Sequence, residues 1–214
     1  MKLYDFPFSP NSRKVRAVAY ELGIELELAP VDLLKGEQRA PSFLAKNPNG
    51  RVPVLEDGDF VLWESTAIVR YLATKGERSP GAHSLVPAGA REQADMDRWL
   101  AWQLAHLAPA TSKVAFERIV KKLTGQGEPD QAAIDIGTAE FGKLTAVLDA
   151  SLANREYVAG RLSIADFALA SHYSIASSCG LDVTKHPRVN AWLARMLERS
   201  SMKRALSDAH ASVR

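Results

Sequence analysis

The chain has 214 residues, of which 46% are hydrophobic and 24% are charged, and its formal net charge is +2 at pH 7. This composition is typical of a globular protein and gives no reason to expect binding to nucleic acid or to an anionic membrane. The single cysteine, Cys179, excludes an internal disulfide and fits a reducing compartment. No apolar stretch approaches the roughly 20 residues needed to cross a bilayer, and no signal-peptide pattern follows Met1, so we expect a cytoplasmic protein.

Residues 1–76 alternate signals for strands and helices. Residues 2–6 predict a strand, residues 15–22 carry apolar side chains at helical spacing before Gly23, and residues 24–28 alternate apolar and acidic side chains like a half-exposed strand. After an irregular segment, two short strands over 52–55 and 60–63 flank an Asp-Gly turn, and a helix follows from Ser65 to Gly76. The predicted order is βαβ-α-ββα, an α/β domain.

The rest of the chain predicts helices alone. Residues 77–90 are rich in proline and glycine and lose all periodicity, so we interpret them as a linker. From residue 91 to residue 214, apolar side chains recur at helical spacing around 96–107, 134–152 and 189–197, and Pro109 predicts a kink or an end in the first of these helices. We expect an all-α second domain over 91–214.

The stretch from Asn47 to Ser65 carries the strongest indication of a binding site. Pro53 cannot donate a ladder hydrogen bond and therefore marks an edge or a turn. If the Val52-Pro53 bond is cis, the backbone of Val52 can pair with a peptide laid alongside it. Ser65 opens a helix, where unpaired amides favour a carboxylate. One exposed backbone edge beside one anion pocket suits a short acidic peptide, and we interpret this stretch as a glutathione site.

Four short motifs occur in a fixed order over about 160 residues. They are Ser9-Pro10-Asn11-Ser12, Asn47-Pro48-x-Gly50-x-Val52-Pro53, Glu64-Ser65 and Gly160-x-x-Ser163-x-x-Asp166. With these motifs, essentially the whole chain resembles the cytosolic glutathione S-transferases, and the serine-type phi and theta classes look closest. The resemblance implies a thioredoxin-like N-terminal domain, an all-α C-terminal domain, glutathione as co-substrate without a metal, and a homodimer. Arg70, Asp95 and Asp97 are candidate interface charges.

Ser9 is the first candidate for activating the glutathione thiol. A thiol with a pKa of about 8.5 is mostly protonated at neutral pH, and each unit of depression needs about 1.4 kcal/mol. A hydroxyl donor beside a helix N-terminus could supply one to two such units. Ser9 could instead act only as a helix cap, and Ser12 is the second candidate. No G-x-S-x-G elbow surrounds Ser9, so a hydrolase triad is not indicated.

The resemblance also implies which residues hold the peptide. Ser65 would take the γ-glutamyl carboxylate, and Glu64 would orient the ammonium group. Gln38 and Arg39 stand where related enzymes bind the glycine carboxylate, and Arg51 stands where the family often has glutamine. For Gln38 and Arg39, a place in a solvated loop is the open alternative.

The electrophile site is predicted less directly. Trp102 and His106 lie one helical turn apart on a helix expected to line the cleft, and with Phe8, Phe116 and Tyr173 they could bind a small apolar electrophile. Packing in the core or in an interface is the alternative for each. His106 has no companion at metal-ligand spacing.

Other residues are interpreted as structural. Asp5 stands where tyrosine-type transferases carry their catalytic residue, and Tyr4 is predicted to point to the opposite face of the strand. Cys179 is far in sequence from the first helix, which argues against thiol-transfer chemistry of the omega class. Ser163 and Asp166 form a predicted N-capping box, so replacing Asp166 should damage folding before chemistry.

Two alternative functions remain open. A zeta-like isomerase would use glutathione on a cis double bond and would need cations such as Arg13 and Lys14 for a dicarboxylate, but Pro10 and Asn11 replace the residues expected after the first serine. A non-enzymatic binding module with this fold would be expected to lose Ser9 or the Glu64-Ser65 pair, and this chain keeps both.

Overall fold

The computed structural model describes residues 1–76 and 84–211. Contacts within the chain divide it into two compact units, one formed by residues 1–86 with 198–214 and the other by residues 87–197. Part of the predicted linker, residues 77–83, lies outside the described residues, and residues 84–89 form neither helix nor strand. The predicted domain boundaries at residues 76 and 91 stay a prediction.

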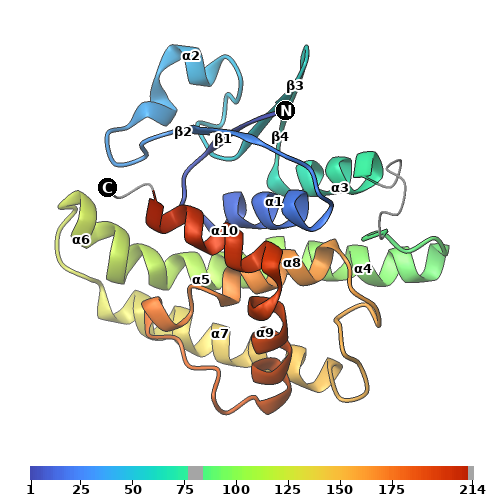
Figure 1. Ribbon diagram of the computed structural model, residues 1–214. Helices are drawn as coiled ribbons and strands as arrows, with labels where there is room; N and C mark the ends of the chain where they lie inside the picture. Colours follow the sequence, from blue (N-terminus) through green and yellow to red (C-terminus); the bar gives the residue numbers. More distant parts are fainter. Residues whose placement is uncertain (77–83, 212–214) are drawn as a thin grey trace. The chain divides into compact units, whose positions relative to one another are not determined.

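The first unit is built on a four-stranded mixed sheet (Figure 1). Its strands are β1 (Lys2–Asp5), β2 (Glu27–Pro30), β3 (Val54–Asp57) and β4 (Phe60–Trp63). The spatial order is β2-β1-β3-β4, with β1 parallel to β2 and antiparallel to β3, and β3 antiparallel to β4. Helix α1 (Pro10–Glu21) makes the parallel crossover between β1 and β2. This arrangement confirms the predicted α/β order.

The second strand begins later than its pattern predicts. The alternation over residues 24–28 was expected to be the strand, whereas β2 covers Glu27–Pro30. The amide of Ile24 donates to Ala19 O at 2.8 Å, so the residues directly after Gly23 complete the end of α1. The chain therefore reaches the sheet three residues further on, where Glu27 pairs with Lys2.

Helices cover both faces of the sheet in the first unit. Helices α1 and α3 (Ser65–Gly76) pack on one face, and η1 (Glu37–Arg39) with α2 (Pro41–Leu44) lies over the other (Figure 1). The first face buries Leu3, Val15, Val18, Leu55, Ile68 and Leu72 completely. The second face packs Phe43 against Val31 and Val54. This layering brings the N-terminal ends of α1 and α3 to the end of the sheet where Pro53 precedes β3.

The C-terminal helix α10 (Ser200–Ala211) belongs to the first unit and packs against α1. Arg16, which is fully buried, forms an ion pair with Asp5 and donates to Pro7 O at 2.8 Å and to Ala205 O at 3.0 Å. Tyr20 OH donates to Asp208 at 2.8 Å on the same interface. A guanidinium with several donors can join the strand end, the loop after it and the C-terminal helix at one point.

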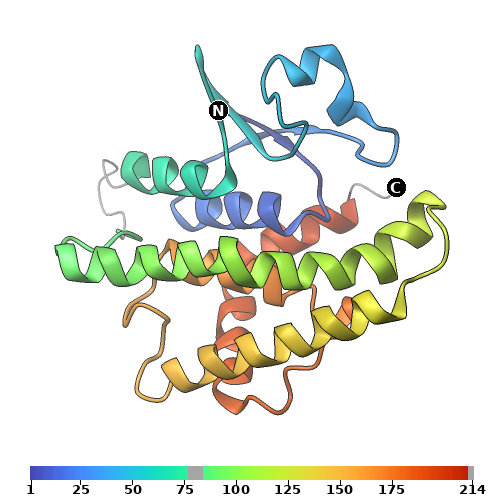
Figure 2. The same ribbon diagram turned by 180° about the vertical axis from the view of Figure 1, so that it is seen from behind.

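The second unit contains only helices among its described residues. They are α4 (Ala90–Trp102), η2 (Gln103–Leu107), α5 (Ala108–Ala115), η3 (Phe116–Val120), α6 (Lys121–Thr124), α7 (Gln131–Ser151), α8 (Ile164–Tyr173), η4 (Ser177–Cys179) and α9 (Pro187–Glu198). The segment from α4 to α6 is one continuous helical run beside α7 (Figure 2). The helix does not end at Pro109, because the wider π-turn of η2 precedes the proline and accommodates its missing amide.

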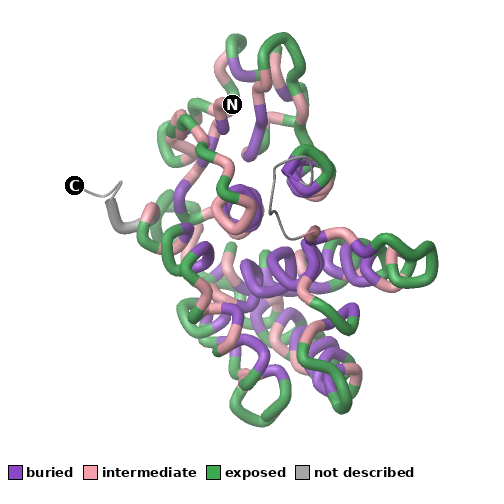
Figure 3. Tube along the Cα trace, turned by 45° about the vertical axis from the view of Figure 1, so that its right-hand side comes forward, coloured by how far each residue is buried: buried purple, intermediate pink, exposed green. Residues whose placement is uncertain are grey.

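Buried residues line the inner sides of the helices in each unit, and exposed residues line the outer sides (Figure 3). In the second unit α8 is the central helix, since all ten of its residues are buried. The predicted capping box at its start is confirmed: Ser163 N and Ser163 Oγ each lie 3.0 Å from Asp166 Oδ2. Within the described ranges, no helix has the length and apolar character that crossing a membrane requires.

Candidate active site

Ser9 lies in the loop between β1 and α1 and caps the helix. Its Oγ accepts a hydrogen bond from Ser12 N at 3.3 Å, and its extended backbone (φ −68°, ψ 123°) is that of an N-cap residue. The side chain is only partly buried. A hydroxyl that accepts from an amide keeps its own proton to donate, so capping and donation to a bound thiolate are compatible.

Ser12 faces the interior of the first unit. It is fully buried, its Oγ accepts from Phe6 N at 3.5 Å, and it hydrogen-bonds the carboxyl of Asp5. Burial raises the pKa of Asp5, while Arg16 and Ser12 oppose that rise. Ser12 therefore stabilises the β1–α1 loop through buried hydrogen bonds, and Ser9 is the more accessible of the two hydroxyls.

Ser65 is the first residue of α3 and lies against the start of α1. Its side chain is buried, and its Oγ donates to Asn11 Oδ1 at 3.4 Å. Two helix N-termini therefore meet at this point. Each presents the positive end of a helix dipole, and the first amides of α3 have no acceptor within their own helix. Sequence reasoning assigned no role to Asn11, although it is part of the Ser9–Ser12 motif.

Glu64 has the left-handed backbone conformation, with φ 69°, and it is the one non-glycine residue with positive φ in the described parts of the chain. Its carbonyl accepts from Ile68 N at 2.9 Å, so Glu64 immediately precedes the helix, and its side chain is exposed. A bulky residue in this conformation costs on the order of 1 kcal/mol, and such residues concentrate at functional sites.

The Val52-Pro53 peptide bond is cis. The register of β3 begins at Val54, so Val52 precedes the ladder and is not paired in the sheet. The turn before it is organised by Asn47, whose side chain donates to Arg51 O at 2.7 Å and accepts from Asn49 N at 3.0 Å. Asn47 is buried, and its organising role was not predicted.

The structure places Gln38 against the same turn. A side chain at Gly50, which has φ 61°, would meet Gln38 O at 3.2 Å, so the 49–51 turn and η1 lie in close contact. Gln38 is partly buried, whereas Arg39 and Arg51 are exposed. Gln38 and Arg39 of η1 and Arg51 of the 49–51 turn therefore lie in two segments that are in contact.

The predicted electrophile residues lie in separate parts of the chain. Phe8 belongs to the first unit, is 47% exposed and contacts Phe6 edge-on at 5.6 Å. In the second unit, the rings of Trp102 and His106 are 6.4 Å apart, and His106 and Phe116 are exposed. Tyr173 lies in the core, where its hydroxyl donates to Thr145 at 3.2 Å.

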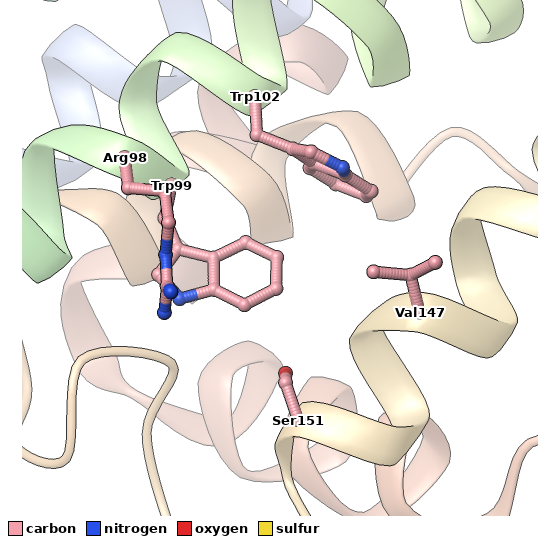
Figure 4. A pocket seen from close by; sticks show the side chains of 5 residues that line it. All are labelled: Arg98, Trp99, Trp102, Val147 and Ser151. Atoms are coloured by element: carbon pink, nitrogen blue, oxygen red, sulfur yellow. The ribbon is translucent and has the colours of Figure 1, made fainter.

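Trp102 also lines a pocket of about 250 Å³ between α4 and α7 (Figure 4). The other lining side chains are Arg98, Trp99, Val147 and Ser151. The two indole rings meet edge to face at 5.3 Å, and Val147 and Ser151 face them across the opening. Around the residues described by the structure, no group of three or more His, Cys, Asp or Glu side chains is arranged to hold a metal ion.

Comparison with known proteins identifies the class that this fold and site define. Residues 1–74 match the family model for the glutathione S-transferase N-terminal domain, and residues 107–200 match the model for its C-terminal domain. The chain belongs to the cytosolic glutathione S-transferase family, and its thioredoxin-like first domain and helical second domain are confirmed.

The individual relatives match nearly the whole chain. "Glutathione S-transferase 3" of Zea mays is 37% identical over 97% of this chain and 93% of its own. "Probable glutathione S-transferase GSTF2" of Oryza sativa subsp. japonica is 34% identical over 97% of this chain and 96% of its own. The crystal structure of glutathione transferase F7 from Populus trichocarpa has a TM-score of 0.89 at 32% identity, covering 97% of this chain and 98% of that one. The chain is a transferase that conjugates glutathione, its co-substrate.

Proposed function

We propose that this transferase is of the serine type, with Ser9 as the donor that stabilises the glutathione thiolate. The single observation that carries the proposal is the position of the Ser9 hydroxyl: it caps α1 on the accessible side, while Ser12 is buried behind it. In this role Ser9 forms no covalent bond. Its O–H donates to the sulfur anion, and the thiol proton leaves to solvent.

The energetics of this step are modest and local. Depressing a thiol pKa from about 8.5 by one to two units needs about 1.4 to 3 kcal/mol. A hydrogen bond to a charged acceptor supplies about 1.5–3 kcal/mol. The positive end of α1, directly beside Ser9, adds a few tenths to 1 kcal/mol. One hydroxyl at this helix terminus is therefore sufficient without a metal or a general base.

The peptide would be held by groups from three segments of the first unit. Ser65 Oγ and the first amides of α3 suit the γ-glutamyl carboxylate, and the exposed carboxylate of Glu64 suits the γ-glutamyl ammonium group. The backbone of Val52, which precedes the β3 ladder, suits the cysteinyl unit. Gln38, Arg39 and Arg51 supply donors for the glycine carboxylate.

We further propose that the electrophile is small and largely apolar. Trp102, His106 and Phe116 offer aromatic surface for it within the second unit, and His106 and Phe116 are exposed. Phe8, the candidate in the first unit, is exposed as well. Conjugation by addition, halide displacement and peroxide reduction all start from the same thiolate. The helical unit would determine which electrophile is accepted, because it contributes three of the four predicted aromatic side chains.

We also propose a homodimer in the cytoplasm, built mainly from α3 and α4, with residues 1–76 and 91–214 as the two domains. Arg70, Asp95 and Asp97 are the candidate interface charges, and each of them also has an interaction within the chain. Asp95 is already engaged within its own unit, by Arg98 and by Arg155 at 2.7 Å. Light scattering coupled to gel filtration would test the dimer, and a monomer at micromolar concentration would contradict it.

The test of the serine-type proposal is a pH titration of thiolate absorbance for glutathione bound to the wild type, to Ser9→Ala and to Ser12→Ala. We expect a thiol pKa one to two units below the solution value in the wild type and near the solution value in Ser9→Ala. Ser12→Ala should keep most of the depression, since Ser12 lies behind the loop. An unshifted thiol in the wild type would reduce the site to a binding module, and a shift lost only in Ser12→Ala would transfer the role to Ser12.

The positions of two basic residues give no support to the alternative function of a zeta-like isomerase. Arg13 and Lys14, the cations considered for binding a dicarboxylate, are both buried, so they do not offer an exposed cationic surface.

A further inference from the structure

Lys14 is a fully buried lysine at the meeting point of the two helix N-termini. It is the fifth residue of α1, its relative exposure is 0%, and its Nζ donates to Thr66 Oγ1 at 3.0 Å. Thr66 is the second residue of α3 and directly follows Ser65. Burying an ammonium group costs several kcal/mol unless nearby groups compensate, and lysines are almost never completely buried unless they are paired.

Burial and the neighbouring Glu64 act on the protonation of Lys14 in opposite directions. Burial lowers the pKa of Lys14 to about 7, and Glu64, which precedes α3, raises it only in part. Arg13 and Arg16 share its helix, and burial lowers the pKa of Arg13 as well. On α10, Asp208 lies near Arg16 Nε at 3.6 Å. Burial therefore disfavours the charged form of the Lys14 amine near neutral pH.

The carboxylate site at Ser65 adjoins Lys14 through the Thr66 hydroxyl. An anion held by Ser65 and the first amides of α3 brings a negative charge to the end of the helix that Lys14 contacts. A nearby opposite charge favours the protonated amine, and the interaction is strong where water is excluded. By linkage, a ligand that favours the protonated form of a group must take up protons when it binds.

We propose that Lys14 is a positioning residue whose protonation is coupled to occupancy of the glutathione site, so that the γ-glutamyl carboxylate binds together with a proton taken from solvent. The inference rests on the proposed assignment of this carboxylate to Ser65. Lys14 lies in the core and outside the proposed peptide contacts. Its protonation would nevertheless determine how the affinity for glutathione changes with pH. The proton remains on Lys14 Nζ and is released when the peptide leaves.

The test uses S-methylglutathione, which has no thiol proton and therefore isolates this coupling from thiolate formation. Its binding enthalpy is measured by calorimetry in two buffers of different ionisation enthalpy, between pH 6.5 and 8. The wild type should take up more protons than Lys14→Met, and the excess should grow from pH 6.5 to pH 8. Lys14→Met should bind more weakly at pH 6.5 and change little with pH.

Two further variants sharpen the comparison. Lys14→Arg keeps a permanent charge, so it should bind without the extra proton uptake. Lys122→Met removes a lysine that is exposed on α6, and it should match the wild type in both affinity and proton uptake. Equal uptake in wild type and Lys14→Met would overturn the inference.

A direct titration keeps the inference testable if Lys14→Met does not fold. The side-chain NMR signal of Lys14 in the wild type, followed against pH with and without S-methylglutathione, should show a higher pKa in the complex. If the pKa of Lys14 is the same with and without S-methylglutathione, the inference is wrong, while the proposed function is unaffected. If the wild type does not bind S-methylglutathione at all, the proposed function fails first and the inference fails with it.

Discussion

In the first compact unit, Ser65 Oγ donates a hydrogen bond to Asn11 Oδ1 at 3.4 Å. The two residues are 54 positions apart, and the contact joins the first turn of α3 to the first turn of α1. It brings the Ser65 hydroxyl, the proposed carboxylate site, and the Ser9 cap to the ends of two neighbouring helices. The positive ends of the two helices then favour an anionic peptide.

Replacing Asn11 with alanine should weaken glutathione binding about fivefold. Ser65 would lose the acceptor that orients its hydroxyl, and a hydrogen bond of this kind contributes about 1 kcal/mol. Calorimetric titration of S-methylglutathione measures the effect. Asn154→Ala, at an exposed position after α7, is the matched control and should bind normally. Full affinity in Asn11→Ala would show that Ser65 is positioned by other contacts.

Ser9→Asp should separate helix capping from thiol activation. Aspartate caps a helix as well as serine does, so the free energy of unfolding should stay within about 0.5 kcal/mol of the wild type. The carboxylate cannot donate to sulfur and repels it, so the thiol pKa should rise above the solution value and kcat/KM should fall at least about tenfold. Denaturant unfolding and steady-state kinetics check the two effects. If kcat/KM is retained, Ser9 serves only as a cap.

Asp166 should be essential for the stability of the helical unit. Its carboxylate also accepts from Val158 N and Trp192 Nε1, each at 3.0 Å, and burial raises its pKa to about 6. Asp166→Ala leaves these buried donors without a partner and should cost about 3 kcal/mol of unfolding free energy. Denaturant titration tests this, with Asp135→Ala on the exposed side of α7 as the control. A cost below 1 kcal/mol would contradict the structural role.

Lys14 should make the stability of the protein depend on pH. Its pKa is about 7 when folded and 10.5 for an unperturbed lysine, so between these values the unfolded chain binds more protons. Stability therefore rises with pH across this window, relative to a variant without the group. Lys14→Met should be more stable than the wild type at pH 6.5, and the difference should shrink at pH 9.5.

Denaturant unfolding of both proteins at the two pH values measures this difference. Lys122→Met should show no such dependence, because that lysine is exposed. A constant difference between wild type and Lys14→Met would mean that Lys14 keeps its proton throughout. The proton-coupled binding inferred above would then lose its physical basis.

The sequence alone determined the features that depend on neighbouring residues. The Asp57-Gly58 turn, the caps at Ser9 and Ser163, and the alternation of strand and helix in the first 76 residues are local patterns, and the structure confirms them. Short motifs in a fixed order also identified the family. Such features are legible because backbone geometry and capping involve residues only a few positions apart.

Only the tertiary structure decided which distant residues meet. Lys14 reaches Thr66 across 52 positions, and Arg16 reaches Ala205 across 189, bringing the C-terminal helix back to the first unit. No periodicity in the sequence predicts these contacts. The sequence also does not distinguish a buried basic residue from a solvent-exposed one. Burial is a property of the packed chain, so the lysine whose pKa falls to about 7 could be recognised only once its surroundings were assembled.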